Sequence, residues 1–233
     1  MLSTLVLFDI DGTILLTAGA GRRAITEALG DLIGVGEVFD RVRFDGKTDP
    51  QIVAELLEAG GHPAPRDATV IETVCQRYLG LLATELLQPR SRTTLMPGVL
   101  ELLAALEAEP RVMLGLLTGN MAQGAALKLQ AGGISPDRFQ VGAYGSDSAH
   151  RPDLPPIAAG RAAPHFGRMP RGREVVIIGD TPADVTCGRG IEARAIGVAT
   201  GAYAVQELAA AGAHLAVADL SDTRRIVEVI LGE

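Results

Sequence analysis

The chain has 233 residues, 47% hydrophobic and 21% charged, which suits one good-sized domain or a core with a small inserted module. A net charge of −7, 3% aromatic residues and no Trp argue against a nucleic-acid partner, which needs a basic face or stacking aromatics. No apolar run is long enough to span a bilayer, and the N-terminus has no basic flank or cleavage site. We therefore expect a cytoplasmic protein with no membrane partner.

The first expected element is a buried strand at residues 2–10, which runs into the sequence Asp-Ile-Asp-Gly-Thr at residues 9–13. Residues two apart in an extended backbone point the same way, so the carboxylates of Asp9 and Asp11 face one spot at the strand's end. Two carboxylates held together repel each other unless a cation or a shared proton lies between them. Taken alone, the motif fits an ordinary acidic turn as well as a reactive site.

The stretch from residue 15 to residue 87 has apolar residues at helical spacing and no convincing strand. The helices expected there lie at residues 21–29, 51–59 and 68–87. Asp49 is expected to be the N-cap of the second helix, with Pro50 in its first turn. Because these helices follow the first strand directly, we interpret the stretch as an insertion into the fold.

From residue 96 onward, strands and helices alternate. The expected strands lie at residues 112–117, 139–141, 175–178, 195–198 and 215–217. The expected helices lie at residues 99–107, 121–131 and 156–163, after Asp184, and after Asp222. This alternation predicts the α/β class, with a Rossmann-like parallel sheet covered on both faces. The sheet core comprises residues 1–15 and 93–233, and a small α-helical cap domain comprises residues 16–92.

A group of polar residues follows the expected strand at residues 112–117, namely Thr118, Gly119 and Asn120. A hydroxyl, a flexible glycine and the N-terminus of the next helix make a natural seat for a phosphate. A plain helix cap is the alternative, and the two are compatible because a cap amide also binds an anion.

Asp180 and Asp184 follow the expected strand at residues 175–178. Asp180 lies beside Asp9 and Asp11 if the two strands are neighbours, and Asp184, one helical turn further on, then braces the same cation. The alternative is again a capped helix start. Polar groups at the carboxyl ends of three strands fit the rule for active sites in open α/β sheets.

Together these sequences resemble the motifs of the haloacid dehalogenase-like hydrolase superfamily. The matching motifs are residues 9–13, Thr118, and Gly-Asp-Thr-x-x-Asp at residues 179–184, in the family's order and spacing. The resemblance runs over essentially the whole chain and includes a helical cap after the first motif. It implies the family's fold and a phosphatase-type enzyme similar to phosphoglycolate phosphatase and β-phosphoglucomutase.

The family's remaining motif is a basic residue, most often Lys, before the last acidic motif. The best match in this chain is Arg151, which keeps the charge and can form a forked pair of hydrogen bonds with a phosphate. Lys128 is the competing candidate, although we expect it to be a solvated lysine on the face of a helix.

The resemblance implies hydrolysis through an aspartyl-phosphate intermediate. Asp9 is then the nucleophile, and Asp11 is the acid for the leaving oxygen and the base for the attacking water. The implied cofactor is Mg²⁺, with a metal set of Asp9, Asp180, Asp184 and the backbone carbonyl of Asp11. The implied phosphate set is Thr118, Gly119, Asn120 and Arg151.

The substrate is much less visible in the sequence. Lys47 lies between expected cap helices, where the family carries its substrate-reading loop, and it either meets a second anionic group of the substrate or is solvated. Because dehalogenating relatives lack an acid at the position of Asp11, we expect a small phosphorylated metabolite, with phosphoglycolate as one candidate. The alternatives are a phosphomutase and, less favoured, a dehalogenase or a non-catalytic phosphate-binding protein. We expect the protein to be a monomer or a homodimer.

Overall fold

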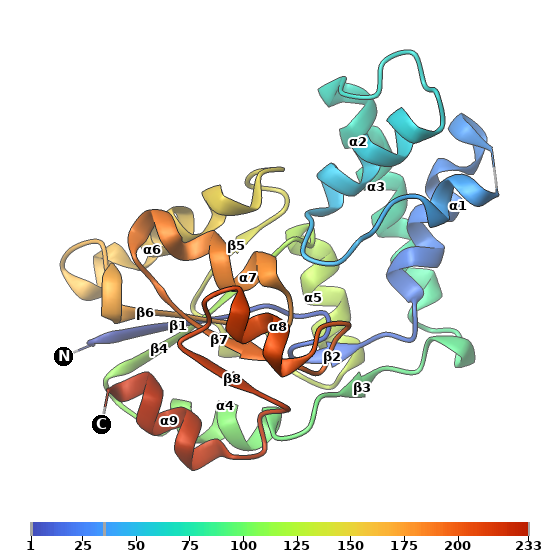
Figure 1. Ribbon diagram of the computed structural model, residues 1–233. Helices are drawn as coiled ribbons and strands as arrows, with labels where there is room; N and C mark the ends of the chain where they lie inside the picture. Colours follow the sequence, from blue (N-terminus) through green and yellow to red (C-terminus); the bar gives the residue numbers. More distant parts are fainter. Residues whose placement is uncertain (1, 35, 233) are drawn as a thin grey trace.

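The computed structural model describes residues 2–34 and 36–232. Within these residues, six parallel strands form one sheet in the order β5-β4-β1-β6-β7-β8 (Figure 1). The strands are β1 (Thr4–Phe8), β4 (Val112–Thr118), β5 (Val141–Tyr144), β6 (Val175–Gly179), β7 (Arg194–Val198) and β8 (Leu215–Val217). The predicted α/β class with a parallel sheet is therefore confirmed.

The described part of the chain also forms α-helices and short 3₁₀ helices. The α-helices are α1 (Ala20–Ile33), α2 (Asp49–Ala59), α3 (Ala68–Glu85), α4 (Val99–Glu107), α5 (Ala122–Ala131), α6 (Leu154–Phe166), α7 (Pro182–Cys187), α8 (Val205–Ala210) and α9 (Thr223–Leu231). The 3₁₀ helices are η1 (Glu37–Asp40), η2 (Pro89–Ser91), η3 (Pro136–Arg138), η4 (Arg151–Asp153), η5 (Gly172–Glu174) and η6 (Gly188–Ile191). None of the described helices combines the length and apolar character needed to cross a membrane.

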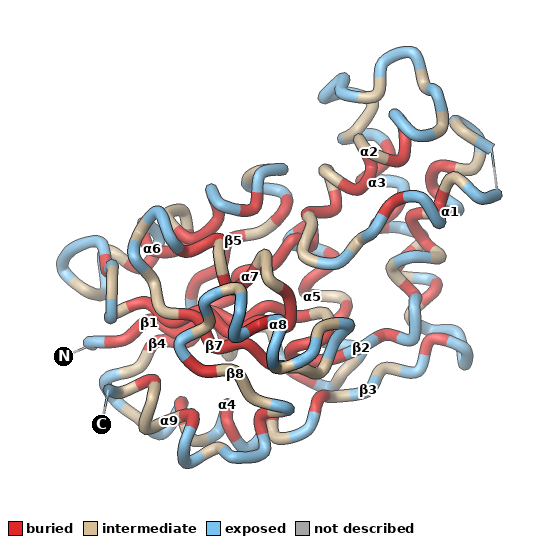
Figure 2. Tube along the Cα trace, in the orientation of Figure 1, coloured by how far each residue is buried: buried red, intermediate tan, exposed pale blue. Residues whose placement is uncertain are grey.

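Helices cover both faces of the sheet. On β1, Val6 and Phe8 belong to one hydrophobic cluster with residues of α4, α5 and α9, whereas Leu5 and Leu7 belong to another with residues of α6 and α7. Because β1 is apolar on both faces, its sequence from Leu5 to Phe8 is a continuous apolar run with no polar alternation. Figure 2 shows buried residues running along these central strands.

The position of β1 decides where the site forms. It lies between β4 and β6, and Phe8 is paired in register with Leu116 on one side and Ile178 on the other. The chain adds β4 and β5 on one side of β1, and then β6, β7 and β8 on the other. A parallel sheet whose strand order reverses in this way leaves a crevice at the carboxyl ends of the strands beside the reversal.

Helices α1, α2 and α3 supply most of a hydrophobic cluster that is distinct from those on the sheet and that also includes Met121 at the start of α5. In α3 the buried residues Val74, Tyr78 and Leu82 recur every fourth position, which places them on one side of the helix. Figure 1 shows this helical segment beside the sheet, on the side of β2 and β3. The assignment of residues 16–92 to a separate domain remains a prediction.

Two short strands join the helical segment to the sheet. β2 (Leu15–Leu16) and β3 (Thr94–Leu95) pair in antiparallel fashion, with Leu15 opposite Leu95. The expectation of no strand between residues 15 and 87 is therefore wrong at Leu15 and Leu16. A two-residue strand is too short to show periodicity, and its partner lies far along the chain.

The starts of two helices also differ from expectation. Thr48 caps α2 instead of Asp49, because its hydroxyl accepts the N–H of Gln51 while the Asp49 carboxylate accepts the N–H of Met121 at 2.8 Å. The helix expected after Asp184 begins earlier, at the first residue of α7. Asp184 then forms the capping box of α7 from inside its first turn.

Candidate active site

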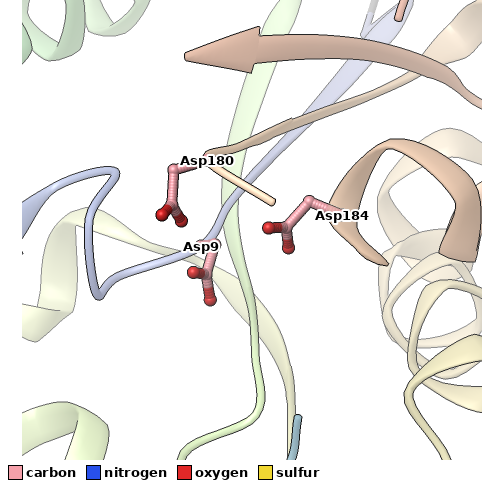
Figure 3. Close-up of side chains that lie close together, drawn as sticks. All are labelled: Asp9, Asp180 and Asp184. Atoms are coloured by element: carbon pink, nitrogen blue, oxygen red, sulfur yellow. The ribbon is translucent and has the colours of Figure 1, made fainter. Parts of the chain in front are cut away.

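Two strand ends bring the expected acidic residues together. Asp9 follows the last residue of β1, and Asp180 follows the last residue of the neighbouring β6. One carboxylate oxygen from each of Asp9, Asp180 and Asp184 lies within 4.8 Å of the others, and all three residues are buried (Figure 3). The predicted neighbourhood of these carboxylates therefore exists in the structure.

Asp184 is held by its own helix start. Its Oδ2 accepts the backbone N–H of Thr181 at 3.0 Å and the Thr181 hydroxyl at 2.6 Å, and its Oδ1 accepts a hydrogen bond from Arg151. Gly179 permits this approach, because a Cβ there would lie 2.2 Å from the Cβ of Asp184. Both oxygens of Asp184 thus have protein partners, which suits a residue that fixes Arg151 beside the other two acids.

The site carries more negative than positive charge. Burial, and secondly the nearby charge of Asp184, raise the pKa of Asp9 to about 7, although Arg151 acts in the opposite direction. The same two causes raise the pKa of Asp180 to about 9. Buried carboxylate oxygens with too little positive charge beside them are the hard donors that Mg²⁺ prefers, so these residues fit that ion.

Arg151, the basic residue that best matches the family motif, reaches this cluster from η4. Its side chain is buried, and its Nη2 lies 3.2 Å from Oδ1 of Asp9 and also contacts Asp184. Its Nε is buried and has no hydrogen-bond partner within the described residues. A guanidinium beside the expected nucleophile suits a phosphate oxygen.

Lys128 contradicts the expectation of a solvated lysine. It is only 5% exposed, and its Nζ lies 2.8 Å and 2.7 Å from the two carboxylate oxygens of Asp11. The reason is tertiary, because α3 packs against α5: a Cβ built on Gly124 would lie 3.3 Å from Leu79. The face of α5 that carries Lys128, which the sequence predicts to be exposed to solvent, is covered by α3.

The Thr-Gly-Asn turn holds Asp11 as well as facing the site. The Asn120 side-chain amide donates to Oδ2 of Asp11 at 2.7 Å and to the Thr118 hydroxyl at 2.8 Å. Thr118 itself is fully buried at the end of β4. These bonds connect the three residues into one polar group beside Asp9.

Gly119 is expected to contact phosphate, but in the structure it packs against the loop that carries Lys47. A Cβ there would lie 2.0 Å from the carbonyl oxygen of Lys47, so a glycine is needed where this loop meets the turn after β4. The carbonyl of Gly119 also accepts the N–H of Asp49 at 2.7 Å. The glycine therefore joins the sheet core to the start of α2.

A cavity of about 500 Å³ lies over the carboxylates, and its lining comes from both the sheet and the helical segment. The predicted site residues in its wall are Asp9, Asp11, Lys47, Thr118, Gly119, Asn120, Arg151 and Asp180. Asp184 lies behind this wall. Lys47 forms an ion pair with Glu55, so it faces the cavity with its charge already compensated.

Other residues around Asp180 received no site role in the sequence analysis, although Thr13 belongs to the first motif. Thr13 lies 3.5 Å from Oδ1 of Asp180, and the Thr200 hydroxyl donates to the carbonyl of Gly12. A Cβ on Gly201 would lie 1.8 Å from Oδ2 of Asp180, so this carboxylate fits only against a glycine. Thr200 and Gly201 follow the end of β7, so the strand-end pattern that revealed Asp180 also applies to them.

Comparison with known proteins agrees with this geometry. The model of the family described as haloacid dehalogenase-like hydrolase matches residues 6–198. A comparison with curated protein sequences finds no match.

Solved structures share the fold over nearly the full chain. β-Phosphoglucomutase from Clostridium difficile has a TM-score of 0.73 at 18% identity, covering 100% of this chain and 98% of its own. A predicted phosphoglycolate phosphatase from Haemophilus somnus has a TM-score of 0.69 at 18% identity, covering 97% of this chain and 98% of its own. CbbY from Rhodobacter sphaeroides, in complex with phosphate, has a TM-score of 0.70 at 22% identity, covering 95% of this chain and 96% of its own. On the family match, the chain belongs to the haloacid dehalogenase-like hydrolases and is an enzyme of that family.

Proposed function

We propose that this protein is a Mg²⁺-dependent phosphatase that hydrolyses a small phosphorylated metabolite through an aspartyl-phosphate on Asp9. The observation that carries the proposal is the convergence of Asp9, Asp180 and Asp184 beside the buried Arg151 at the wall of a cavity. The fold shared with a predicted phosphoglycolate phosphatase, and with a structure that holds phosphate, supports it.

The carboxylates of Asp9 and Asp180 and the backbone carbonyl of Asp11 would hold the metal ion. Asp184 braces the site by holding Arg151 and Thr181 in place. When bound, Mg²⁺ supplies positive charge that lets an anionic phosphate approach an anionic carboxylate.

In the first step, an oxygen of Asp9 attacks phosphorus, and the bond from phosphorus to the ester oxygen breaks. Arg151, 3.2 Å from Asp9, is placed to bind the phosphoryl oxygens as their charge redistributes. Thr118, fully buried at the adjacent strand end, completes the polar wall on the β4 side.

Asp11 is the proposed proton donor to the leaving oxygen. In the second step it takes a proton from the water that attacks the aspartyl-phosphate, which releases inorganic phosphate and restores Asp9. Lys128 contacts both oxygens of Asp11 in the structure, so proton donation requires Asp11 to turn away from this lysine. The Asp11 side chain is 41% exposed and has room for that movement.

The deciding experiment is a panel of phosphorylated metabolites incubated with the protein, with Mg²⁺ and with a chelator. The proposal expects Mg²⁺-dependent release of inorganic phosphate from at least one ester. Binding of phosphate esters without turnover would replace it with a non-catalytic phosphate-binding role.

A phosphomutase is the second candidate, favoured by the fold shared with β-phosphoglucomutase over the whole chain. A mutase would use the same residues but pass the phosphoryl group to a second hydroxyl of a sugar. Isomerised sugar phosphate without net phosphate release would identify that activity. The cytoplasmic location and the monomeric or homodimeric state remain predictions.

A further inference from the structure

Tyr78 in α3 carries a buried polar group that nothing in the fold uses. Its side chain is fully buried, and its hydroxyl has no hydrogen-bond partner among the described residues. Tyr78 also lines the cavity over the carboxylates. A hydroxyl buried without a partner is costly, which makes one at the wall of a cavity a candidate ligand contact.

Lys128 lies on the same part of the cavity wall. A Cβ built on Gly21 of α1 would lie 3.5 Å from the Lys128 Nζ and 3.7 Å from the Tyr78 hydroxyl oxygen. The ammonium has three N–H donors, and its two described bonds both go to Asp11. The space left by the missing side chain of Gly21 is therefore bordered by a free hydroxyl and by an ammonium with a spare donor.

The charges around this space disfavour an anionic ligand group. Each cation of the described lining already contacts a carboxylate: the pairs are Arg22–Asp40, Lys47–Glu55, Lys128–Asp11 and Arg151–Asp9. The buried carboxyl of Asp49 is a further acidic group of the same lining. A second anion on the substrate would thus find no uncompensated cation there, whereas a neutral hydroxyl needs only hydrogen bonds.

We propose that Tyr78 and Lys128 form a subsite for a hydroxyl on the leaving group, so that phosphorylated polyols or sugars are preferred to phosphorylated carboxylic acids. The subsite lies on the leaving-group side because Lys128 contacts Asp11, the proposed proton donor to the leaving oxygen. The inference rests on the proposed phosphatase function and deepens it. It ranks phosphoglycolate, whose leaving group carries a carboxylate, below a polyol phosphate.

The test compares kcat/KM with Mg²⁺ for esters that differ in the leaving group: glycerol phosphate, ethyl phosphate, phosphoglycolate and phenyl phosphate. Glycerol phosphate is expected to exceed ethyl phosphate and phosphoglycolate by about tenfold, the factor that one or two hydrogen bonds supply. Tyr78→Phe is expected to remove about three- to tenfold of the glycerol phosphate value, mostly through KM. The kcat/KM of Tyr78→Phe for ethyl phosphate and phenyl phosphate is expected to equal that of the unsubstituted protein, because these esters have no hydroxyl on the leaving group.

Two further variants separate a binding role from a structural one. Tyr144→Phe removes a tyrosine hydroxyl from β5, outside the cavity lining, and is the matched control with unchanged selectivity. Gly21→Ala places a methyl group in the subsite and is expected to weaken glycerol phosphate selectively. The melting temperature of Tyr78→Phe is expected to be unchanged or higher, because the hydroxyl it loses has no partner among the described residues.

The outcomes distinguish the two levels of the proposal. Equal values for glycerol and ethyl phosphate, a preference for phosphoglycolate, or an unaltered Tyr78→Phe would overturn the subsite and leave the phosphatase intact. Absence of Mg²⁺-dependent turnover of all four esters, phenyl phosphate included, would overturn the phosphatase and the subsite with it.

Discussion

At the scale of single residues, the site depends on how each carboxylate is held. Asp9 lies beside a guanidinium, Asp11 contacts an ammonium and an amide, and both oxygens of Asp184 have partners. Asp180 lies against the backbone of two glycines, Gly12 and Gly201. These different surroundings are the physical basis for giving chemically identical side chains different roles.

Removing either acid of the first motif is predicted to impair turnover, for a different reason in each case. Asp9→Asn lacks the nucleophile, so Mg²⁺-dependent turnover of a phosphomonoester is expected to disappear. Asp11→Asn loses the acid and base, and kcat is expected to fall by about 10²–10⁴-fold. Asp31→Asn, an exposed acid paired with Arg77, is the matched control. Substantial activity in either site variant would contradict these roles.

Arg151 is predicted to matter for stability as well as for turnover. Arg151→Met leaves the buried carboxylate of Asp184 without its cation, and loss of one partner of a buried pair costs roughly 3–5 kcal/mol. Arg151→Lys keeps the charge and is expected to retain part of both properties. Urea unfolding and kcat measured together test this, and a fully stable Arg151→Met would refute the structural half.

The raised pKa values of Asp9 and Asp180 predict that metal-free protein loses stability as pH rises. Both groups stay protonated in the folded state above the ordinary carboxylate pKa of 3.8, so the folded state binds more protons than the unfolded state. The free energy of unfolding therefore falls as the pH rises from about 4. The fall ends near the folded-state pKa of each group, about 7 for Asp9 and about 9 for Asp180.

Mg²⁺ competes with these protons, so it is expected to raise the melting temperature more at pH 8 than at pH 5. Calorimetry with Mg²⁺ and with a chelator at both pH values measures this difference. An Asp180→Asn variant serves as the control, because it removes one of the titrating groups. An equal shift at the two pH values would contradict the assignment.

At the scale of elements, the start of α2 is the joint between the helical segment and the sheet. Asp49 accepts the N–H of Met121, its own N–H binds the carbonyl of Gly119, and the Thr48 hydroxyl binds the carbonyl of Ala149. One helix terminus is therefore attached to two loops of the sheet core. This attachment brings Lys47 to the cavity wall.

Gly119→Ala is predicted to loosen this joint. Its Cβ would lie 2.0 Å from the Lys47 carbonyl oxygen, so the backbone has to shift, and we expect a loss of about 1–3 kcal/mol together with a higher KM. Gly160→Ala in α6 has no atom within 4 Å of the new Cβ and is the matched control. If both variants unfold at the same urea concentration, the close approach does not constrain the loop.

At the scale of the whole molecule, the cavity lies between two parts of the chain that pack around different hydrophobic clusters. One cluster belongs to the sheet and its helices, and the other belongs to α1, α2 and α3. The carboxylates of Asp9 and Asp180 come from the strand ends of the sheet, whereas Tyr78, Gly21 and Lys47 come from the helical segment. A site assembled in this way can keep its chemistry while its substrate preference changes with the helical segment.

Much of the fold and of the acidic cluster could be predicted from local sequence signals. Continuous apolar runs, one directly before Asp9 and one that leads to Gly179, identify two strands and their ends. Parallel pairing of the strands then brings those ends together. Helix α4 and strand β8 have the predicted bounds: the buried residues of α4 recur at helical spacing, and β8 is a short apolar run. The short strands β2 and β3 gave no such signal, and the N-cap of α2 was ambiguous because Thr48 and Asp49 are both favoured N-cap residues.

The sequence by itself determined the α/β class and which acids stand at the strand ends, since both follow from backbone periodicity and the parallel sheet. Only the tertiary structure decided that Lys128 is buried against Asp11, and that Tyr78 reaches the cavity without a partner among the described residues. Both depend on α3 packing over α5, a contact between residues far apart in the chain. Sequence patterns report which side of an element is apolar, but not which other element covers it.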